Sequence, residues 1–209
     1  MEELYNNLIR IEAFDGIKLY SYNNICLSPG YDMSRSEIAC SLSHLKAIYS
    51  AYKNGDKHAL IMEDDIYNSF EYLWKDSIAD IIKFKPRNVE CIQLHCINPE
   101  IINKMLLKKE RFIKWCEQSW GAGCYYITRK GMRKIVKKYI KNNIINLSIS
   151  MKNKADINLI YGTLNTVVYT RPLFEHQISE STIHPSHLDT IHFKALCIIC
   201  NYFNMNGTV

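Results

Sequence analysis

The sequence predicts an α/β protein in which a mainly parallel sheet is flanked by helices. Segments 58–62 and 89–95 have the apolar or alternating pattern of strands, and stretches with helical periodicity stand between and after them. The order strand, helix, strand, helix favours parallel strands joined by crossovers. No repeat, low-complexity linker or Pro/Gly/Ser-rich run divides the 209 residues, so we expect a single domain over 1–209.

The first half is expected to form a loop, a helix and a strand in turn. The loop is expected at 24–30. A helix is expected from Ser34 or Ser36 to about Lys53. Ser34 and Glu37 have the spacing of a capping box, and apolar residues follow at helical spacing. Gly55 is expected to end it, directly before the strand 58–62.

The second half is expected to continue this alternation. A helix is expected over 70–84, a small-residue loop that enters a short strand over 121–128, and a basic helix over 131–141. The segment 98–118 carries no diagnostic motif and is read as a variable loop. The tail from residue 188 onward is expected to pack as a terminal helix.

Composition indicates a soluble globular protein. Hydrophobic residues make up 47% and charged residues 22% of the chain. The formal net charge of +5 is compatible with an anionic substrate such as a nucleotide, and no nucleic-acid partner is expected. Neither a signal peptide nor an apolar run of membrane-spanning length is evident. A cytoplasmic location is therefore expected, with attachment to a membrane surface or a virus-infected cell as alternative settings.

Six of the eight cysteines lack the spacing of a disulfide framework and are expected to be reduced and mostly buried: Cys26, Cys40, Cys91, Cys96, Cys116 and Cys124. Cys197 and Cys200 have the spacing of a metal knuckle, but the residues between them are apolar and no second pair accompanies them. Structural packing is the expected role of this pair.

The most informative segment is the apolar run 59–62, which ends on Glu63, Asp64 and Asp65. Three adjacent carboxylates repel one another unless a cation lies among them. In open α/β sheets, ligands bind at the carboxyl ends of strands. The segment therefore predicts a metal-assisted phosphate site, and the alternative is a solvated turn or the start of a helix.

Five motifs in this order resemble glycosyltransferase family 25, the lipooligosaccharide and procollagen galactosyltransferases, over about 9–185. One such motif would be a weak signal, whereas five in sequence are a strong one. The motifs are Arg10-Ile-Glu-Ala-Phe-Asp-Gly16, Glu37-Ile-Ala-Cys-Ser-Leu-Ser-His44-Leu, Ala59-Leu-Ile-Met-Glu-Asp-Asp65, Gly121-Ala-Gly-Cys-Tyr-Tyr-Ile-Thr-Arg-Lys-Gly131, and Ala155-Asp156 with Pro172-Leu-Phe-Glu-His-Gln177.

The resemblance implies a GT-A-like fold and an inverting transfer of a sugar, galactose above all, from a UDP-sugar. The acceptor would be a glycan or a hydroxylated protein side chain. A Mn²⁺ or Mg²⁺ ion would stabilise the diphosphate leaving group. Asp65 is expected to be its first ligand and Glu63 the second, because alternate side chains of an extended segment share a side, with Asp64 as a ribose or supporting partner.

The resemblance also places other residues at the donor. Ser43 and His44 are assigned to the donor pocket, although a lone helical histidine is more often a packed or capped side chain. Gly121 and Ala122 would let the substrate approach the backbone, and a tight turn is compatible with this. Arg10 is assigned to the same pocket.

Two assignments near the end of the motifs are of different kinds. Asp156 is the expected general base, with a helix N-cap as the alternative role. Gln177 and Arg171 are expected to contact sugar or phosphate, and for Arg171 a surface ion pair is the alternative.

The chain departs from the family at its start, where an apolar first strand is expected and only residues 1–9 stand. We therefore expect an N-terminally shortened fold, which a second copy, a partner chain or an upstream fragment would complete. One rival interpretation is a catalytically silent relative that binds glycans or assists assembly. Another is a metal-dependent phosphohydrolase built on the acidic triplet alone.

Overall fold

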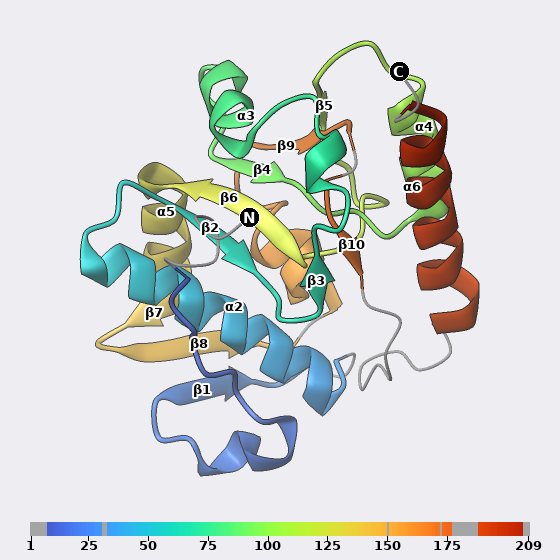
Figure 1. Ribbon diagram of the computed structural model, residues 1–209. Coiled ribbons are helices and arrows are strands. Elements are labelled where there is room, and N and C mark those ends of the chain that lie inside the picture. The colour runs from blue at the N-terminus through green and yellow to red at the C-terminus, as the bar shows by residue number, and fades with distance from the viewer. Residues whose placement is uncertain (1–7, 31–32, 150, 172, 177–187, 207–209) are drawn as a thin grey trace.

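The computed structural model describes residues 8–30, 33–149, 151–171, 173–176 and 188–206 (Figure 1). Strands and helices occur throughout the described part of the chain. Their bounds are β1 Ile25–Ser28, α2 Arg35–Asn54, β2 His58–Met62, β3 Ile66–Tyr67, α3 Ile78–Phe84, β4 Cys91–Gln93, α4 Pro99–Leu106, β5 Phe112–Lys114, β6 Cys124–Thr128, α5 Arg129–Tyr139, β7 Ile140–Lys141, β8 Ile144–Ser148, β9 Thr166–Tyr169, β10 Glu175–His176 and α6 Phe193–Asn206.

A five-stranded sheet with the order β2-β6-β4-β9-β5 forms the centre of the molecule. The α/β class is confirmed, but the strand directions are mixed instead of mainly parallel. Only β4 and β9 pair in parallel in this sheet, while β6 is antiparallel to both β2 and β4. The order of elements along the chain correctly predicts that β2 and β4 run the same way. It does not reveal that β6 inserts between them in the opposite direction.

The two faces of β6 belong to two different hydrophobic cores. Tyr125 and Ile127 face the core formed with α2 and α5, whereas Cys124 and Tyr126 face the core that contains Ile81 of α3. This alternation follows from the two-residue period of a strand. Because both faces are covered, four of the five residues of β6 are buried.

Helix α2 lies between the five-stranded sheet and a second sheet with the order β1-β8-β7 (Figure 1). The expected capping box is confirmed, since the Ser34 hydroxyl accepts from the Glu37 N–H and the Glu37 carboxylate accepts from the Ser34 N–H. The helix ends at Gly55, which has a φ of +89°. Leu42, Leu45 and Ile48 are fully buried, and each contributes about 1.5–3 kcal/mol of burial free energy.

The helix expected over 70–84 is shorter in the structure. A 3-10 turn covers Glu71–Leu73, and α3 begins only at Ile78. Ser77 and Asp80 form a capping box of their own, which starts α3 there. The intervening chain is held from outside, because the carboxylate of Asp76 accepts hydrogen bonds from Arg111 and Tyr169.

Two segments expected to be loops contain regular structure. Residues 24–30 include β1, which pairs in parallel with β8. Residues 98–118 include α4 and β5, and the Asn98 side chain caps α4 with Pro99 at its first turn. Asn-Pro at a helix start is a signal that the sequence does carry.

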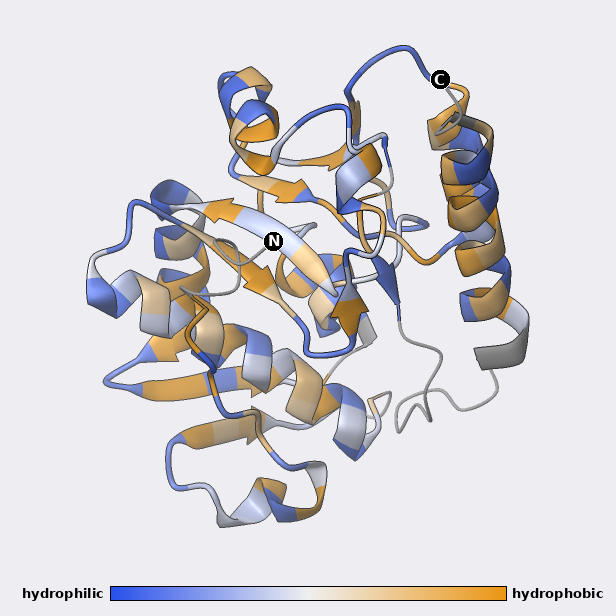
Figure 2. Cartoon of the chain, viewed as in Figure 1, coloured by the Kyte–Doolittle hydropathy of each residue, from blue (hydrophilic) through white to orange (hydrophobic). Residues whose placement is uncertain are grey.

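The C-terminal segment forms a helix, as expected. Helix α6 packs against α4, and Phe203 stacks on Phe70 with ring centroids 4.6 Å apart. Ala195 and Ile199 are buried on the same face of α6. Hydrophobic colour is concentrated on β2 and β4, whereas both colours alternate along α6 (Figure 2). Among the described residues, no helix has the length and apolar character needed to cross a membrane.

Candidate active site

The chain turns sharply at the carboxyl end of β2, where the three carboxylates stand. Residues 64–65 form a turn between β2 and β3, so the segment does not continue as an extended strand. Asp64 is exposed, whereas Glu63 and Asp65 are each about one third exposed at 33% and 36%. Because of the turn, Glu63 and Asp65 have different neighbours.

Glu63 lies against helix α2. Its Oε1 atom is 2.9 Å from Nε2 of His44 and 3.7 Å from Sγ of Cys40. His44 is buried, and its Nδ1 atom lies 3.1 Å from the hydroxyl of Tyr125. Burial opposes ionisation of Glu63, but the hydrogen bond with His44 and the charge of that ring outweigh it and lower the pKa of Glu63. Glu63 is therefore an ionised carboxylate held by a buried histidine.

Asp65 lies next to β10, whereas Glu63 lies next to α2. Strands β3 and β10 pair so that Ile66 stands opposite His176, and this register brings Nε2 of His176 to 3.6 Å from Oδ2 of Asp65. The Oδ1 atom of Asp65 is buried without a hydrogen-bond partner. Burial and the nearby charge of Glu63 raise the pKa of Asp65, against the attraction of His176. One oxygen of this carboxylate thus remains available for a cation.

His95 extends this group from the end of β4. Its ring stacks on that of His176 with centroids 5.9 Å apart, and its Nδ1 atom is buried without a hydrogen-bond partner. Burial, with a smaller effect of His176, lowers the pKa of His95 to about 3. His95 is therefore a neutral imidazole. Sequence reasoning missed both histidines, although His176 stands in the last of the quoted motifs and His95 ends an expected strand.

Asp156 stands in a single π-helical turn, Ala155–Leu159. No side chain caps this turn, so the alternative role of Asp156 as an N-cap is wrong. Instead, Oδ2 of Asp156 accepts a hydrogen bond of 3.2 Å from the N–H of Gly121. Burial raises the pKa of Asp156, and the hydrogen bond from Gly121 opposes this only in part. A carboxylate with a raised pKa is suited to accept a proton.

Gln93 holds the loop that carries Gly121 in place by hydrogen bonds to backbone carbonyls. This fully buried side chain donates to the carbonyls of His95, Ser119 and Gly121. Tyr161 donates to the Gly121 carbonyl as well, over 3.1 Å. Sequence reasoning missed Gln93, and a polar residue in the middle of an expected buried strand was the available signal.

Small residues in this loop have structural reasons. Gly121 has a φ of +112°, which favours glycine. A Cβ on Gly123 would lie 2.4 Å from Cδ1 of Ile66 and 2.7 Å from Nδ1 of His95, so any larger residue there would force these side chains to shift. Ala122 is buried. The nearest turn lies at residues 117–118, before Gly121, so the tight-turn interpretation and donor contact by Gly121 and Ala122 both stay predictions.

The remaining predicted donor residues lie in various surroundings. The Ser43 hydroxyl accepts from the Phe14 N–H and donates to the Ala39 carbonyl, so it ties the N-terminal segment to α2. Arg10 is exposed in that segment. Gln177 lies outside the described residues. Donor binding by these residues stays a prediction.

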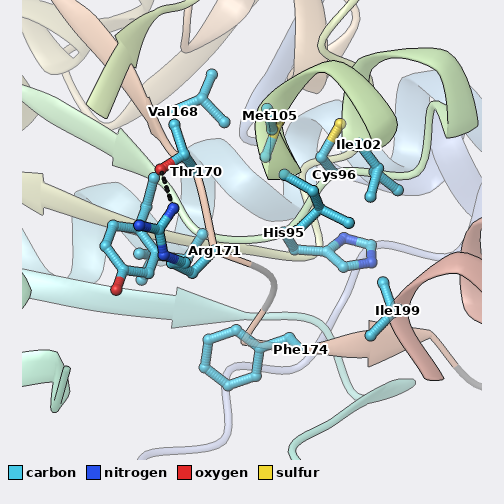
Figure 3. Close-up of a pocket in the computed structure, with 12 residues that line it drawn as sticks. His95, Cys96, Ile102, Met105, Val168, Thr170, Arg171, Phe174 and Ile199 are labelled. Carbon is cyan, nitrogen blue, oxygen red and sulfur yellow. Dashed lines mark hydrogen bonds between the residues drawn. The ribbon is translucent and has the colours of Figure 1, made fainter. Parts of the chain in front are cut away.

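A small, mostly apolar pocket lies beside this cluster, between α4, α6 and the ends of β4 and β9 (Figure 3). His95 belongs both to the pocket lining and to the histidine pair. Arg171 also lines the pocket, where its Nη1 atom donates to the Lys108 carbonyl and to the Thr170 hydroxyl. Both acceptors of this nitrogen are neutral oxygens, so neither of the two hydrogen bonds is an ion pair.

Carboxylates, imidazoles and a thiol thus gather at the carboxyl end of β2 and around the adjoining loops. Such donors are suited to binding a cation, and Asp156 adds a proton acceptor near them. The fold and these side chains define an α/β protein with a cluster of polar, titratable side chains at one end of its central sheet.

The sequence assigns this protein to a family. The profile of Glycosyltransferase family 25 (LPS biosynthesis protein) matches residues 3–151, which is more than half of the chain. The chain therefore belongs to glycosyltransferase family 25, and the predicted family is confirmed. The match includes the first four motifs, whereas the fifth, at 155–177, lies beyond the matched residues.

One curated relative is a protein of Haemophilus influenzae named "Putative glycosyltransferase". The two sequences are 28% identical over an alignment of 167 positions that covers 71% of this chain and 54% of the relative. The chain thus spans about half the length of this relative. The comparison with solved structures found no match to the chain.

Proposed function

We propose that this protein transfers a sugar, galactose above all, from a UDP-sugar to a hydroxyl group with inversion at the anomeric carbon. The acceptor is a glycan or a hydroxylated protein side chain. Membership of glycosyltransferase family 25 supports glycosyl transfer. The observation that carries the chemical part of the proposal is the pair of available carboxylates, Asp65 and Asp156, at one end of the sheet.

Asp65 is the proposed ligand of a Mn²⁺ or Mg²⁺ ion. The buried Oδ1 atom without a hydrogen-bond partner fits a hard divalent cation, and carboxylate oxygen is the preferred ligand of both ions. His176, at 3.6 Å from the other oxygen, is placed to join it. When bound, the ion would stabilise the negative charge that develops on the diphosphate as the sugar leaves. Glu63 as a second ligand of the same ion stays a prediction.

Asp156 is the proposed general base. It would accept the proton of the acceptor hydroxyl while that oxygen forms the new bond to the anomeric carbon and the UDP leaves from the opposite side. The N–H of Gly121 fixes the position of Oδ2 by donating to it. The raised pKa of Asp156 makes it a stronger base than an exposed aspartate.

Calorimetric titration with UDP and UDP-galactose, first with Mn²⁺ and then with the metal chelated, tests the donor site. We expect binding only with Mn²⁺, and we expect Asp65→Ala to abolish it while the circular dichroism spectrum is unchanged. Glu117→Ala, which removes an exposed carboxylate elsewhere, is the matched control and should bind as the wild type does.

The transfer itself is tested by UDP release from UDP-galactose in the presence of candidate acceptors. Asp156→Asn should slow this release far more than it weakens donor binding. Folded wild-type protein that binds neither donor nor Mn²⁺ would support the silent glycan-binding relative instead. Phosphate release from simple phosphate esters without an acceptor would support a phosphohydrolase.

A further inference from the structure

Three side chains of different donor type meet where α2 passes the end of β2. Cys40 and His44 stand one helical turn apart on the same face of α2, and Glu63 faces both of them. The thiol sulfur, the imidazole nitrogen and a carboxylate oxygen of this group all lie within 4.8 Å of one another. Among the described residues, this is the one group of three His, Cys, Asp or Glu side chains whose ligand atoms lie this close to one another.

We propose that Cys40, His44 and Glu63 form a binding site for a borderline transition metal ion of the Zn²⁺ type. This proposal goes beyond the proposed function, because it assigns Glu63, the expected second ligand of the Mn²⁺ or Mg²⁺ ion at Asp65, to a separate metal ion with other ligands. Sulfur and imidazole nitrogen select Zn²⁺, Co²⁺ or Fe²⁺, whereas Mn²⁺ and Mg²⁺ prefer oxygen ligands. The cluster offers one sulfur, one nitrogen and one oxygen, and such a mixed set favours Zn²⁺, Co²⁺ or Fe²⁺ over Mn²⁺ and Mg²⁺.

Two of the three distances between the ligand atoms can be compared with those of a tetrahedral zinc site. With Zn–S of about 2.3 Å and Zn–N and Zn–O of about 2.1 Å, tetrahedral angles place S and O about 3.6 Å apart and N and O about 3.4 Å apart. The structure has 3.7 Å between Sγ of Cys40 and Oε1 of Glu63, and 2.9 Å between Nε2 of His44 and the same oxygen. The second pair is a hydrogen bond, and it would open by about 0.5 Å when a cation replaces the proton.

The surroundings of His44 favour this role. Its other ring nitrogen, Nδ1, lies 3.1 Å from the hydroxyl of the fully buried Tyr125, so the ring is held with Nε2 toward Glu63. A metal-binding histidine is commonly fixed in this way by a hydrogen bond to its other nitrogen. In the metal-free protein Nε2–H donates to Glu63. When an ion replaces that proton, the lone pair of Nε2 binds the ion while Nδ1–H donates to Tyr125.

The site has three protein ligands and room for a fourth. The side chain of Glu63 is about one third exposed, at 33%, so solvent or a substrate atom can reach the ion from that side. Three protein ligands with one open position are typical of zinc sites that bind a further molecule. Metal binding would release the thiol proton of Cys40 to solvent, leaving the thiolate as the ligand.

Cobalt titration of the whole purified chain, kept reduced, tests this proposal by a signal independent of enzymatic activity. We expect one equivalent of Co²⁺ to produce visible bands of a four-coordinate ion and a near-ultraviolet thiolate-to-cobalt charge-transfer band. Zn²⁺ should bleach both, and Mn²⁺ should not. Cys40→Ser should lose the charge-transfer band, whereas Cys116→Ser, which removes an exposed thiol, should keep it.

Two further variants separate this site from its neighbours. Tyr125→Phe should keep the band but weaken Co²⁺ binding about 10- to 100-fold, because it removes the partner that orients His44. Asp65→Ala should leave the band unchanged even if it abolishes donor binding, so the two proposals can fail separately. A wild-type protein without the band, or a band that survives Cys40→Ser in folded protein, would overturn the inference. If Cys40→Ser does not fold, loss of the band in folded His44→Asn decides, and its persistence there would also overturn the inference.

Discussion

Gly121→Ala tests whether the backbone of the loop before β6 positions Asp156. Gly121 has a φ of +112°, and an alanine in such a conformation costs about 1–3 kcal/mol. The new Cβ would lie 3.3 Å from Nδ1 of His95 and 3.4 Å from the backbone nitrogen of Ile97, so these groups must also shift slightly. We expect the loop to relieve this strain by rotating the N–H of residue 121 away from Asp156.

The magnitude follows from the hydrogen bond that is lost. A bond from an N–H to a charged carboxylate contributes about 1.5–3 kcal/mol. If it holds Asp156 in place for proton transfer, its loss corresponds to a decrease of about ten- to a hundredfold in the rate of transfer. Gly55→Ala is the matched control, because Gly55 has a φ of +89° and no atom within 4 Å of the added Cβ. It should lose about 1–2 kcal/mol of stability and keep full activity.

Urea unfolding followed by circular dichroism measures the stability of both variants, and kcat/KM for the UDP-sugar measures transfer. We expect Gly121→Ala to be destabilised at least as much as Gly55→Ala, and the two variants to differ in kcat/KM by tenfold or more. Equal kcat/KM values in the two variants would show that the loop backbone does not position Asp156.

Three further predictions concern stability. Burial raises the pKa of Asp156 above its ordinary 3.8, so the folded protein loses stability as the pH rises from 3.8 through the raised pKa and the carboxyl group ionises. Asp156→Asn should therefore melt at a higher temperature than the wild type at pH 7 and lose this advantage below pH 3.8. An unchanged melting temperature at pH 7 would contradict this prediction. Burial opposes ionisation of Glu90, but hydrogen bonds from Lys134 and other donors lower its pKa below 4.5, so its stabilising effect is present above that value and lost as the pH falls through the lowered pKa. Glu90→Gln should therefore lose about 1.5–3 kcal/mol in urea unfolding at pH 7, and an equal loss at acidic pH would refute the charge contribution. Phe203→Ala should cost about 3–5 kcal/mol in the same assay, because this ring is buried and stacked on Phe70; a loss below 1 kcal/mol would show that α6 contributes little.

Local signals in the sequence predicted the elements that short-range chemistry determines. The capping box of Ser34 and Glu37 starts α2, and Gly55 ends it, because these effects involve residues a few positions apart. The helix expected over 70–84 was wrong in its first half, since Asp76 is held by residues distant in sequence. Contacts of this kind leave no local pattern.

The sequence predicted which residue types the candidate site contains, but it did not predict which of these residues contact one another in the structure. The acidic triplet marked the end of β2, but the turn at Asp65 sends that carboxylate toward His176 and leaves Glu63 with His44. His176 reaches the site through the pairing of β10 with β3, and the sequence separation of these two short strands hides that pairing. Gln93 is likewise buried beneath a loop that comes much later in the chain.

The insertion of β6 between β2 and β4 has a consequence for how the chain folds. During synthesis β2 and β4 emerge first, yet neither can pair with the other, because the strand that joins them is made later. Until residues 124–128 are available, both strands present open edges, which are prone to associate with other chains. The central sheet therefore forms from non-local contacts in a late step, and we expect slow folding and aggregation of fragments that end before β6.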